Sequence, residues 1–250
     1  MNYQGSIPTL SSQHEQSSRQ VIRDIFNSSP IPDSEMLYNL PLFINRQNLS
    51  RVFHLKSLYE QILDVHGVIM EFGVRWGQNL ALFSALRGML EPFNFSRKVI
   101  GFDTFDGFPS VHEKDNKFIS HKKGDLGVSK DYEDVLGKIL QYHESECPNP
   151  HIKKHEIVKG DATKTVANYL ERNPQTIISF AYFDMDIYEP TVEVLKQILP
   201  YCTKGTILGF DELNCSIFPG ETVAVREILG TDNFKVHRSP LDPYGAYIVL

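Results

Sequence analysis

Two pairs of acidic residues stand where apolar runs of the sequence end. The stretch "FAYFDMDIYEPT" places Asp184 and Asp186 after one run, and "GTILGFDELN" places Asp211 and Glu212 after the next. Residues two apart in an extended chain share a face, so Asp184 and Asp186 are expected to point to the same side. Converging carboxylates repel one another unless a cation neutralises them. An all-oxygen set of ligands suits Mg²⁺, Mn²⁺ or Ca²⁺ better than zinc.

A hard cation held by these acids could activate an alcohol. A divalent metal lowers the pKa of the hydroxyl that it binds and orients it. A carboxylate within reach can then accept the proton as the oxygen attacks a methyl group. The alternative for one acid of the four, Asp186 or Glu212, is that it caps the helix that follows.

A glycine-containing turn follows another apolar run, in "VIMEFGVRWGQN". Gly73 and Gly77 are spaced unlike the dinucleotide motif GxGxxG, and the Lys and Ser or Thr of a P-loop are missing, so the ligand need not carry phosphate. Glu71 suggests a cationic ligand, and Asp103, at the end of the next apolar run, could accept two hydrogen bonds from a ribose diol. S-adenosylmethionine has this cationic head and ribose without phosphate. A plain turn with solvated acids is the alternative.

The surrounding sequence predicts elements that bring these residues to one edge of a sheet. Strands are expected at 67–72, 97–103, 155–161, 176–186, 205–214, 234–239 and 245–250, and helices at 43–64, 77–90, 131–143, 162–172, 189–202 and 220–230. Alternating strands and helices indicate an α/β fold with a mostly parallel central sheet and helices on both faces. In such sheets ligands bind beyond the carboxyl ends of the strands, which is where the acids stand.

The chain is expected to form one domain after an N-terminal arm. Residues 1–40 are rich in Ser, Gln, Asn and Pro and predict a partly ordered arm. Residues 41–250 predict a single domain, in which 41–66 form a helical cap or lid. This predicted helix has more apolar residues than one face needs, so it either covers a cofactor or packs against a second subunit.

Bulk properties exclude several classes of function. A net charge of −6 argues against a nucleic-acid partner. No apolar run approaches the roughly 18 residues of a membrane span, and the polar start lacks the apolar core of a secretion signal. Three cysteines, an odd and small number, fit a reducing compartment better than a disulfide framework. A cytoplasmic protein without a membrane partner is therefore expected.

Five motifs taken together give the chain a family resemblance. From about residue 43 to the C-terminus, the sequence resembles the macrocin O-methyltransferase family through "EFGVRWGQN", "KVIGFDTFDGFP", "KGDATKTV", "FDMDIYEPT" and "GFDELN…FPGETVAVRE". The resemblance implies a Rossmann-like class I methyltransferase fold with an N-terminal helical cap. It also implies methylation of a sugar hydroxyl by S-adenosylmethionine with Mg²⁺ assistance, in glycan or natural-product biosynthesis. The sugar could be free, nucleotide-linked or a glycoside, and a homo-oligomer, dimer or higher, is favoured.

The resemblance also implies roles for single residues. The metal ligands would be Asp184, Asp211 and Glu212, with Asn214 as an alternative. The catalytic pair would be Asp184 and Asp186, with Asp186 taking the proton. The expected cofactor contacts are Glu71, Gly73, Gly77, Asn79, Asp103, Thr104, Phe105, Asp161, Ala162 and Asp184. Their positions, rather than the resemblance, place four residues near the substrate: Arg75, Trp76, Tyr188 and His112. Arg75 and Trp76 project from the glycine turn and could instead face a neighbouring subunit. The family usually has Asp where this chain has Glu212, and Trp before Arg where this chain has Arg75 and then Trp76.

Other interpretations of these features stay open at this point. The acids would also suit a metal-dependent methyltransferase of a catechol-like phenol, and the turn would suit a protein that binds S-adenosylmethionine without turnover. His112 lies in the long polar stretch 104–130, where a solvated loop residue is the favoured alternative. Tyr188 is equally explained by packing. The stretch Asp242-Pro243-Tyr244 predicts a turn.

Overall fold

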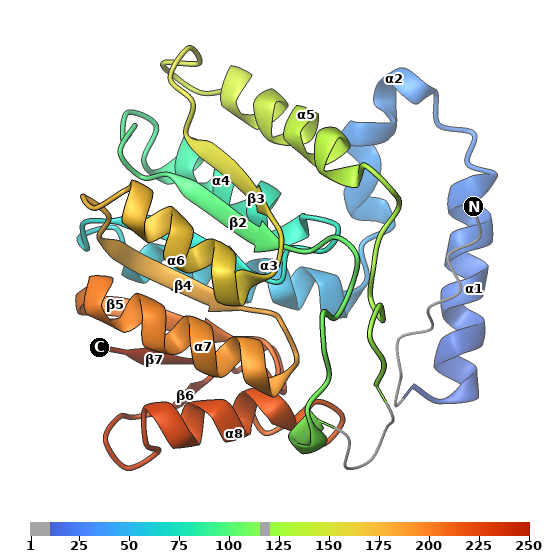
Figure 1. The fold of residues 1–250 in the computed structure, drawn as a ribbon. Coiled ribbons are helices and arrows are strands. Elements are labelled where there is room, and N and C mark those ends of the chain that lie inside the picture. The colour runs from blue at the N-terminus through green and yellow to red at the C-terminus, as the bar shows by residue number, and fades with distance from the viewer. Residues whose placement is uncertain (1–10, 116–120) are drawn as a thin grey trace.

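A seven-stranded sheet forms the centre of the molecule (Figure 1). The computed structural model describes residues 11–115 and 121–250. In chain order the strands are β1 (Val68–Phe72), β2 (Val99–Asp103), β3 (His155–Lys159), β4 (Ile178–Phe183), β5 (Cys202–Phe210), β6 (His237–Arg238) and β7 (Ala246–Val249). In space their order is β3-β2-β1-β4-β5-β7-β6.

The direction of the strands fixes where a ligand can bind. Strands β1 to β5 are parallel, and β7 runs antiparallel between β5 and β6. The chain moves outward from β1 through β2 to β3, then returns to place β4 on the other side of β1. At such a reversal the connections after β1 and β4 leave on opposite faces of the sheet, which opens a crevice at their carboxyl ends.

Helices cover both faces of the sheet (Figure 1). One face packs against α3 (Arg46–Gln61), α4 (Gln78–Leu90) and α5 (Tyr132–Ser145), and the other against α6 (Ala162–Arg172), α7 (Tyr188–Ile198) and α8 (Pro219–Ile228). Side chains alternate along each strand, so Phe180 and Tyr182 face the first group while Ala181 and Phe183 face the second. Short 3₁₀ turns complete this part of the chain, η2 (Glu113–Asp115) and η3 (Leu199–Tyr201).

The N-terminal part is more helical than the sequence predicts. Residues expected to form a partly ordered arm contain α1 (Gln13–Asn27), α2 (Asp33–Met36) and the 3₁₀ helix η1 (Leu37–Leu42). A reciprocal capping box between Ser12 and Glu15 starts α1, a local signal that composition alone does not reveal. These three elements bury no residue, and Figure 1 shows α1 apart from the sheet.

The predicted fold class is confirmed. Each strand and helix expected between residues 43 and 250 is present with its ends shifted by a few residues. The first predicted helix begins at Arg46 rather than residue 43, because the Asn45 side chain accepts a hydrogen bond from the backbone N–H of Asn48 at 2.8 Å and caps it. Within the described residues, no helix combines the length and apolarity that crossing a membrane requires.

Candidate active site

A cavity of about 340 Å³ opens at the carboxyl ends of the parallel strands. Every strand end that the sequence marks with an acid contributes to it. The acids on its wall include Asp103, Asp161, Asp184, Asp186, Asp211 and Glu212. This volume lies in the range of small-molecule sites. The topology therefore brings together residues that are far apart in the sequence.

The turn between β1 and α4 needs both of its glycines for packing. Gly73 has φ +90°, and a Cβ there would lie 1.9 Å from the backbone oxygen of Asp184. Gly77 has φ +78° and forms the N-cap of α4, and a Cβ there would lie 2.3 Å from the Leu136 side chain. Gly73 lines the cavity. The turn is thus pressed against β4 on one side and α5 on the other, which fixes the floor of the site.

Asp103 ties this turn to the loop after β2. Its carboxylate accepts the backbone N–H of Arg75 at 2.7 Å and that of Phe105 at 2.5 Å. Burial raises the pKa of Asp103, while these backbone donors oppose the shift. Asp103 and Thr104 line the cavity, whereas the Phe105 ring is buried in the core. Nucleotide-binding folds place a ribose acceptor at the end of the second strand, so contact between Asp103 and a ribose stays a prediction.

Glu71 lies deeper than the sequence suggests. Its side chain has no exposed surface, and Asn79 stands between it and the acids of the cavity. The Asn79 amide nitrogen donates to Glu71 Oε1 at 2.9 Å and to Asp184 Oδ2 at 3.2 Å. Burial and the Asp184 charge raise the pKa of Glu71 well above its usual range. Contact between Glu71 and a cationic cofactor stays a prediction.

Asp184 and Asp211 are joined by a residue that the sequence analysis missed. Arg51, on α3, places its Nη2 atom 2.6 Å from Asp184 Oδ2 and its Nη1 atom 2.5 Å from Asp211 Oδ1. Its Nε atom donates to Asn79 Oδ1 at 3.1 Å, and the Tyr182 hydroxyl donates to Asp211 Oδ1 at 2.7 Å. No local motif marks Arg51, because its partners are 133 and 160 positions away.

The surroundings of each acid set its pKa. Burial raises the pKa of Asp184 to about 7, with repulsion from Asp211 adding to the effect and Arg51 opposing it. Burial would also raise the pKa of Asp211, but the Arg51 guanidinium and the Tyr182 hydroxyl hold it below its usual value. Burial raises the pKa of Glu212 to about 7. The cluster therefore depends on cationic neighbours to stay ionised.

Asp186 is held in an uncommon backbone conformation. It has φ +64° and an exposed fraction of 7%. Burial raises its pKa well above the usual range, and the neighbouring carboxylates, Asp184 first, raise it further. Non-glycine residues in this region often mark functional sites. A raised pKa makes Asp186 a stronger base once it is ionised, and a proton acceptor has to be in that ionised form.

The helix-capping interpretation of Asp186 and Glu212 is wrong. The N-cap of α7 is Ile187 and that of α8 is Phe218, and neither cap has a side-chain hydrogen bond. The acid that does cap a helix is Asp161, whose carboxylate accepts the Thr163 N–H at 3.0 Å at the start of α6. Asp161 and Ala162 both line the cavity.

Carboxylates are the type of ligand that a hard cation prefers, but these acids are not arranged around a single cation position. Asp184, Asp211 and Glu212 line the same cavity, and Glu212 Oε2 is buried without a hydrogen-bond partner. In residues 11–115 and 121–250, however, no three acid, His or Cys side chains are grouped to hold a metal as they stand. The Arg51 guanidinium lies between the first two carboxylates. Asn214, the alternative ligand, is exposed and outside the cavity lining.

A further acid, Glu221 on α8, supports the end of β5. It is fully buried, and its Oε1 atom accepts the backbone N–H of Glu212 at 3.1 Å. Burial raises the pKa of Glu221 well above its usual range. The sequence contains this residue in "FPGETVAVRE", but helical spacing alone does not show that it turns inward.

The four predicted substrate residues fall into two groups. Arg75 and Trp76 line the cavity, and the Trp76 ring packs edge-on against Tyr132 at 4.8 Å between centroids. His112 and Tyr188 lie outside the cavity lining, with ring centroids 5.0 Å apart. A substrate contact for any of the four stays a prediction.

Asp115 anchors the loop after β2 to α7. Its Oδ1 atom accepts the backbone N–H of Tyr188 at 2.8 Å, and its Oδ2 atom accepts that of His112 at 2.9 Å. A Cβ on Gly220 would lie 2.0 Å from Asp115 Oδ1, so α8 needs glycine at this contact. The predicted turn at Asp242 is confirmed, since its Oδ1 atom accepts the N–H groups of Tyr244 and Gly245 at 3.0 Å.

Comparisons with solved structures identify relatives over almost the whole chain. A structure described as the calicheamicin methyltransferase CalS11 is 42% identical, with 99% of each chain covered and a TM-score of 0.93. A structure of CalS11 without ligand, described as a TDP-rhamnose 3'-O-methyltransferase, is 40% identical, with 96% of each chain covered and a TM-score of 0.85. The O-methyltransferase NovP shares the fold at 20% identity, with 80% of this chain and 79% of its own covered and a TM-score of 0.64.

The fold and the site define a class I methyltransferase. The chain belongs to the macrocin O-methyltransferase family of S-adenosylmethionine-dependent sugar O-methyltransferases, as its motifs predict. It is therefore an enzyme that uses S-adenosylmethionine to methylate oxygen. No protein-family model and no curated protein matches the chain.

Proposed function

We propose that this enzyme methylates a hydroxyl of a nucleotide-linked deoxyhexose such as TDP-rhamnose, in natural-product biosynthesis. The observation that carries the proposal is the 40% identity, over 96% of both chains, to a protein described as a TDP-rhamnose 3'-O-methyltransferase. The cavity adds support, because one wall has a candidate ribose acceptor, Asp103, and another has the acids Asp184 and Asp186. This arrangement suits a cofactor and an acceptor bound side by side.

The chain's own residues would hold the cofactor by shape and hydrogen bonding. Gly73 lets the backbone approach the ligand, Asp103 accepts from the ribose diol, and Asp161 and Ala162 border the adenine side. Asn79 already bonds Asp184 and Arg51, so it connects this side of the cavity to the acid cluster.

The reaction needs one proton acceptor. As the acceptor oxygen bonds to the methyl carbon, the carbon–sulfur bond breaks and the sulfonium becomes a neutral thioether. The hydroxyl proton passes to the buried side chain of Asp186 in its ionised form, which a cation held by the neighbouring acids would favour. Alignment of oxygen, carbon and sulfur by the cavity walls supplies much of the remaining rate.

Asp184, Asp211 and Glu212 are the residues that would hold Mg²⁺. Their carboxylates line the cavity and are the ligand type that this ion prefers. Bound there, the ion would lower the pKa of an acceptor hydroxyl and neutralise the acids. Removing divalent ions with EDTA should abolish turnover, and added Mg²⁺ should restore it.

Other features of the chain support proposals about its assembly and its location. Apolar side chains on the N-terminal elements are widely exposed, with Leu37 at 75%, Tyr38 at 87% and Leu42 at 65%. We propose that they pack against a second copy, which light scattering would detect as a dimer or a larger oligomer. The three cysteines are free, which supports work in a reducing cytoplasm.

Product formation tests the proposed substrate. The purified enzyme, S-adenosylmethionine and Mg²⁺ are incubated separately with TDP-rhamnose, free rhamnose and a catechol, and mass spectrometry detects the gain of one methylene unit. The proposal expects product from the nucleotide sugar at a rate well above the other two. Methylation of the catechol alone, or of free rhamnose with equal efficiency, would refute it.

A further inference from the structure

Arg51 is a cation that the protein itself inserts among its acids. Its two terminal nitrogens lie 2.5 and 2.6 Å from Asp211 and Asp184, and its third nitrogen lies 3.1 Å from Asn79. All three guanidinium nitrogens are therefore bound to groups of the site. A planar fork of donors matches paired carboxylates in a way that a lysine ammonium does not.

The two carboxylates that bind Arg51 are two of the three proposed metal ligands. The oxygens that face the guanidinium, Asp184 Oδ2 and Asp211 Oδ1, accept short charge-assisted hydrogen bonds. A divalent cation placed between these carboxylates would meet a like charge within a few Å, which is unfavourable in a partly buried site. Arg51 and a metal ion would therefore compete for this pair of carboxylates.

The two halves of α3, the helix that carries Arg51, differ in how many of their side chains are buried. Its C-terminal half is anchored by Leu55, Leu58, Tyr59 and the following Ile62, all with no exposed surface. Its N-terminal half, residues 46–53, has no buried residue. Within one copy of the chain, the elements before it, α1 to η1, bury none either. A segment with so few buried contacts opens locally at low free-energy cost.

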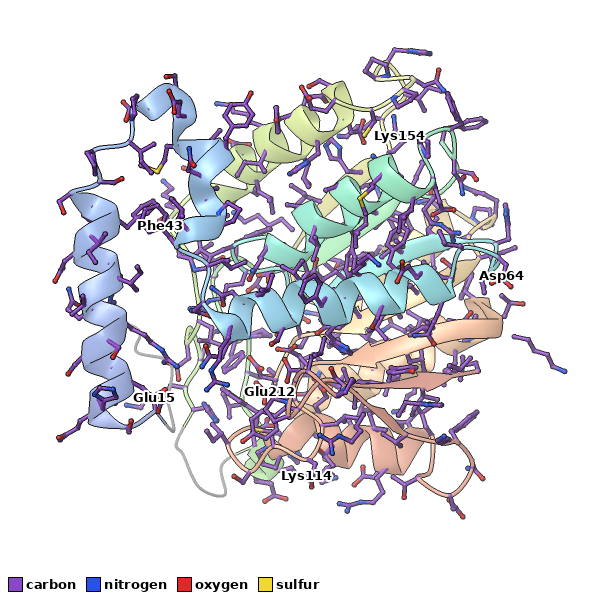
Figure 2. All side chains as sticks on the ribbon, turned by 180° about the vertical axis from the view of Figure 1, so that it is seen from behind. Glu15, Phe43, Asp64, Lys114, Lys154 and Glu212 are labelled. Atoms are coloured by element: carbon purple, nitrogen blue, oxygen red, sulfur yellow. The ribbon has the colours of Figure 1, made fainter. Side chains whose placement is uncertain are left out.

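The geometry of α3 places this weakly held half at the site. The helix crosses the sheet from the side of the molecule where Glu212 lies to the opposite side, where Asp64 follows its end (Figure 2). The Arg51 side chain lines the cavity and is 20% exposed, so it has a path to solvent. Movement of residues 46–53 would therefore change the wall of the cavity.

We propose that Arg51 is a displaceable counter-ion. It holds Asp184 and Asp211 together in the metal-free enzyme, and a divalent cation that enters the site replaces it and releases the N-terminal half of α3. This inference rests on the metal site of the proposed function and adds that metal loading and α3 docking oppose each other. By thermodynamic linkage, the factor by which Arg51 weakens metal binding equals the factor by which metal weakens Arg51 docking.

Metal affinity in the absence of substrate tests the competition. Mn²⁺ is titrated into the full-length wild type and the variants Arg51→Ala, Arg51→Lys and Arg46→Ala, and free Mn²⁺ is measured by electron paramagnetic resonance. Arg46 is the matched control, since it is an exposed arginine on the same helix. We expect roughly tenfold tighter binding for Arg51→Ala, a typical size for coupling between sites. Arg46→Ala should match the wild type.

Arg51→Lys distinguishes the hydrogen bonds of the guanidinium to both carboxylates from its positive charge. Lysine keeps the positive charge but cannot bind both carboxylates as a fork. It should therefore bind Mn²⁺ more tightly than the wild type and less tightly than Arg51→Ala. A lysine variant with wild-type affinity would show that charge alone acts, and would overturn the proposal.

Hydrogen exchange of the wild-type protein tests the release of α3 without any variant. Saturating Mn²⁺ should speed exchange of the amides of residues 46–53 and leave those of residues 55–61 unchanged. Unchanged exchange in 46–53, or equal Mn²⁺ affinity of the wild type and Arg51→Ala, would overturn the counter-ion role while leaving the metal site intact. Absence of Mn²⁺ binding by every protein would instead refute the metal site, and this inference with it.

Discussion

Replacing Asp186 with Asn tests the proton acceptor with little change in shape. Asn has the same size as Asp and tolerates positive φ, so the backbone at φ +64° should persist. The amide cannot accept the hydroxyl proton. S-adenosylmethionine should bind as before, because the substitution leaves Asp103 and the glycine turn untouched.

The expected loss of rate follows from the role of the carboxylate. General-base catalysis contributes about 10²- to 10⁴-fold, which corresponds to roughly 2.7–5.4 kcal/mol of activation free energy. Asp186 is 7% exposed and surrounded by carboxylates, so solvent has little access to replace it as acceptor. We therefore expect kcat for Asp186→Asn to fall by at least a hundredfold, within the range given for such bases.

Asp186→Asn should lower kcat but should not lower the thermal stability of the protein. The pKa of Asp186 is raised in the folded protein, so the folded state binds a proton more tightly than the unfolded state. Stability therefore falls as pH rises from the unfolded pKa of about 3.9 through the raised value. The neutral Asn avoids this loss, and Asp186→Asn should unfold at or above the wild-type temperature at neutral pH.

Three measurements decide the outcome. Single-turnover mass spectrometry gives the methyl-transfer rate, calorimetry gives the dissociation constant of S-adenosylmethionine, and a thermal scan gives Tm. A variant that transfers methyl within threefold of the wild-type rate, roughly 0.6 kcal/mol of activation free energy, would refute the assignment of Asp186. A variant with lower Tm and lost cofactor binding would show a structural role instead.

Three further substitutions probe the frame of the site. Gly73→Ala should destabilise the protein by about 3 kcal/mol or more, because its Cβ would lie 1.9 Å from the Asp184 backbone oxygen; thermal unfolding measures this. Asp103→Ala should weaken S-adenosylmethionine binding by about 1.5–3 kcal/mol, roughly 10- to 150-fold in Kd by calorimetry, since it removes a charged acceptor. Arg97→Met should lower the free energy of unfolding by about 3–5 kcal/mol in urea titrations, because Arg97 is 2% exposed and pairs with Glu91 at 2.9 Å.

Each of these substitutions has a matched control. Gly137→Ala on α5 meets no atom within 4 Å, and the better helix propensity of Ala should stabilise the protein by about 0.5–1 kcal/mol. Asp106→Ala removes an exposed acid close to Asp103 and should leave cofactor affinity unchanged. Arg172→Ala removes an exposed arginine and should leave unfolding unchanged. Equal effects of a substitution and its control would contradict the structural reason given for it.

The sequence predicts the acids of the site because they lie at strand ends. Parallel strands end at the same edge of a sheet, so periodicity alone places Asp103, Asp184 and Asp211 together. The complete burial of Glu71 is harder to predict. It precedes the turn in the sequence, but β1 is a central strand, and the neighbouring Asn79 covers the carboxylate.

Arg51 could not be predicted from local pattern. A charged residue on a helix normally marks a solvated face, and only the packing of α3 across the end of β4 and β5 turns this one inward. The helix α1 was missed for the opposite reason. Its start signal, Ser12 with Glu15, is local and readable, but the polar composition of the segment obscured it.

The anchoring of the loop after β2 by Asp115 limits how this enzyme can be re-engineered. One carboxylate joins the loop backbone at His112 to the first residue of α7, Tyr188, and α7 begins two residues after Asp186. A displacement of Asp115 would therefore move the start of α7 and, with it, the proposed base Asp186. A loop transplanted from a relative to change acceptor choice has to carry an acid at this position and meet a glycine at 220, or the graft will shift the base that it is meant to serve.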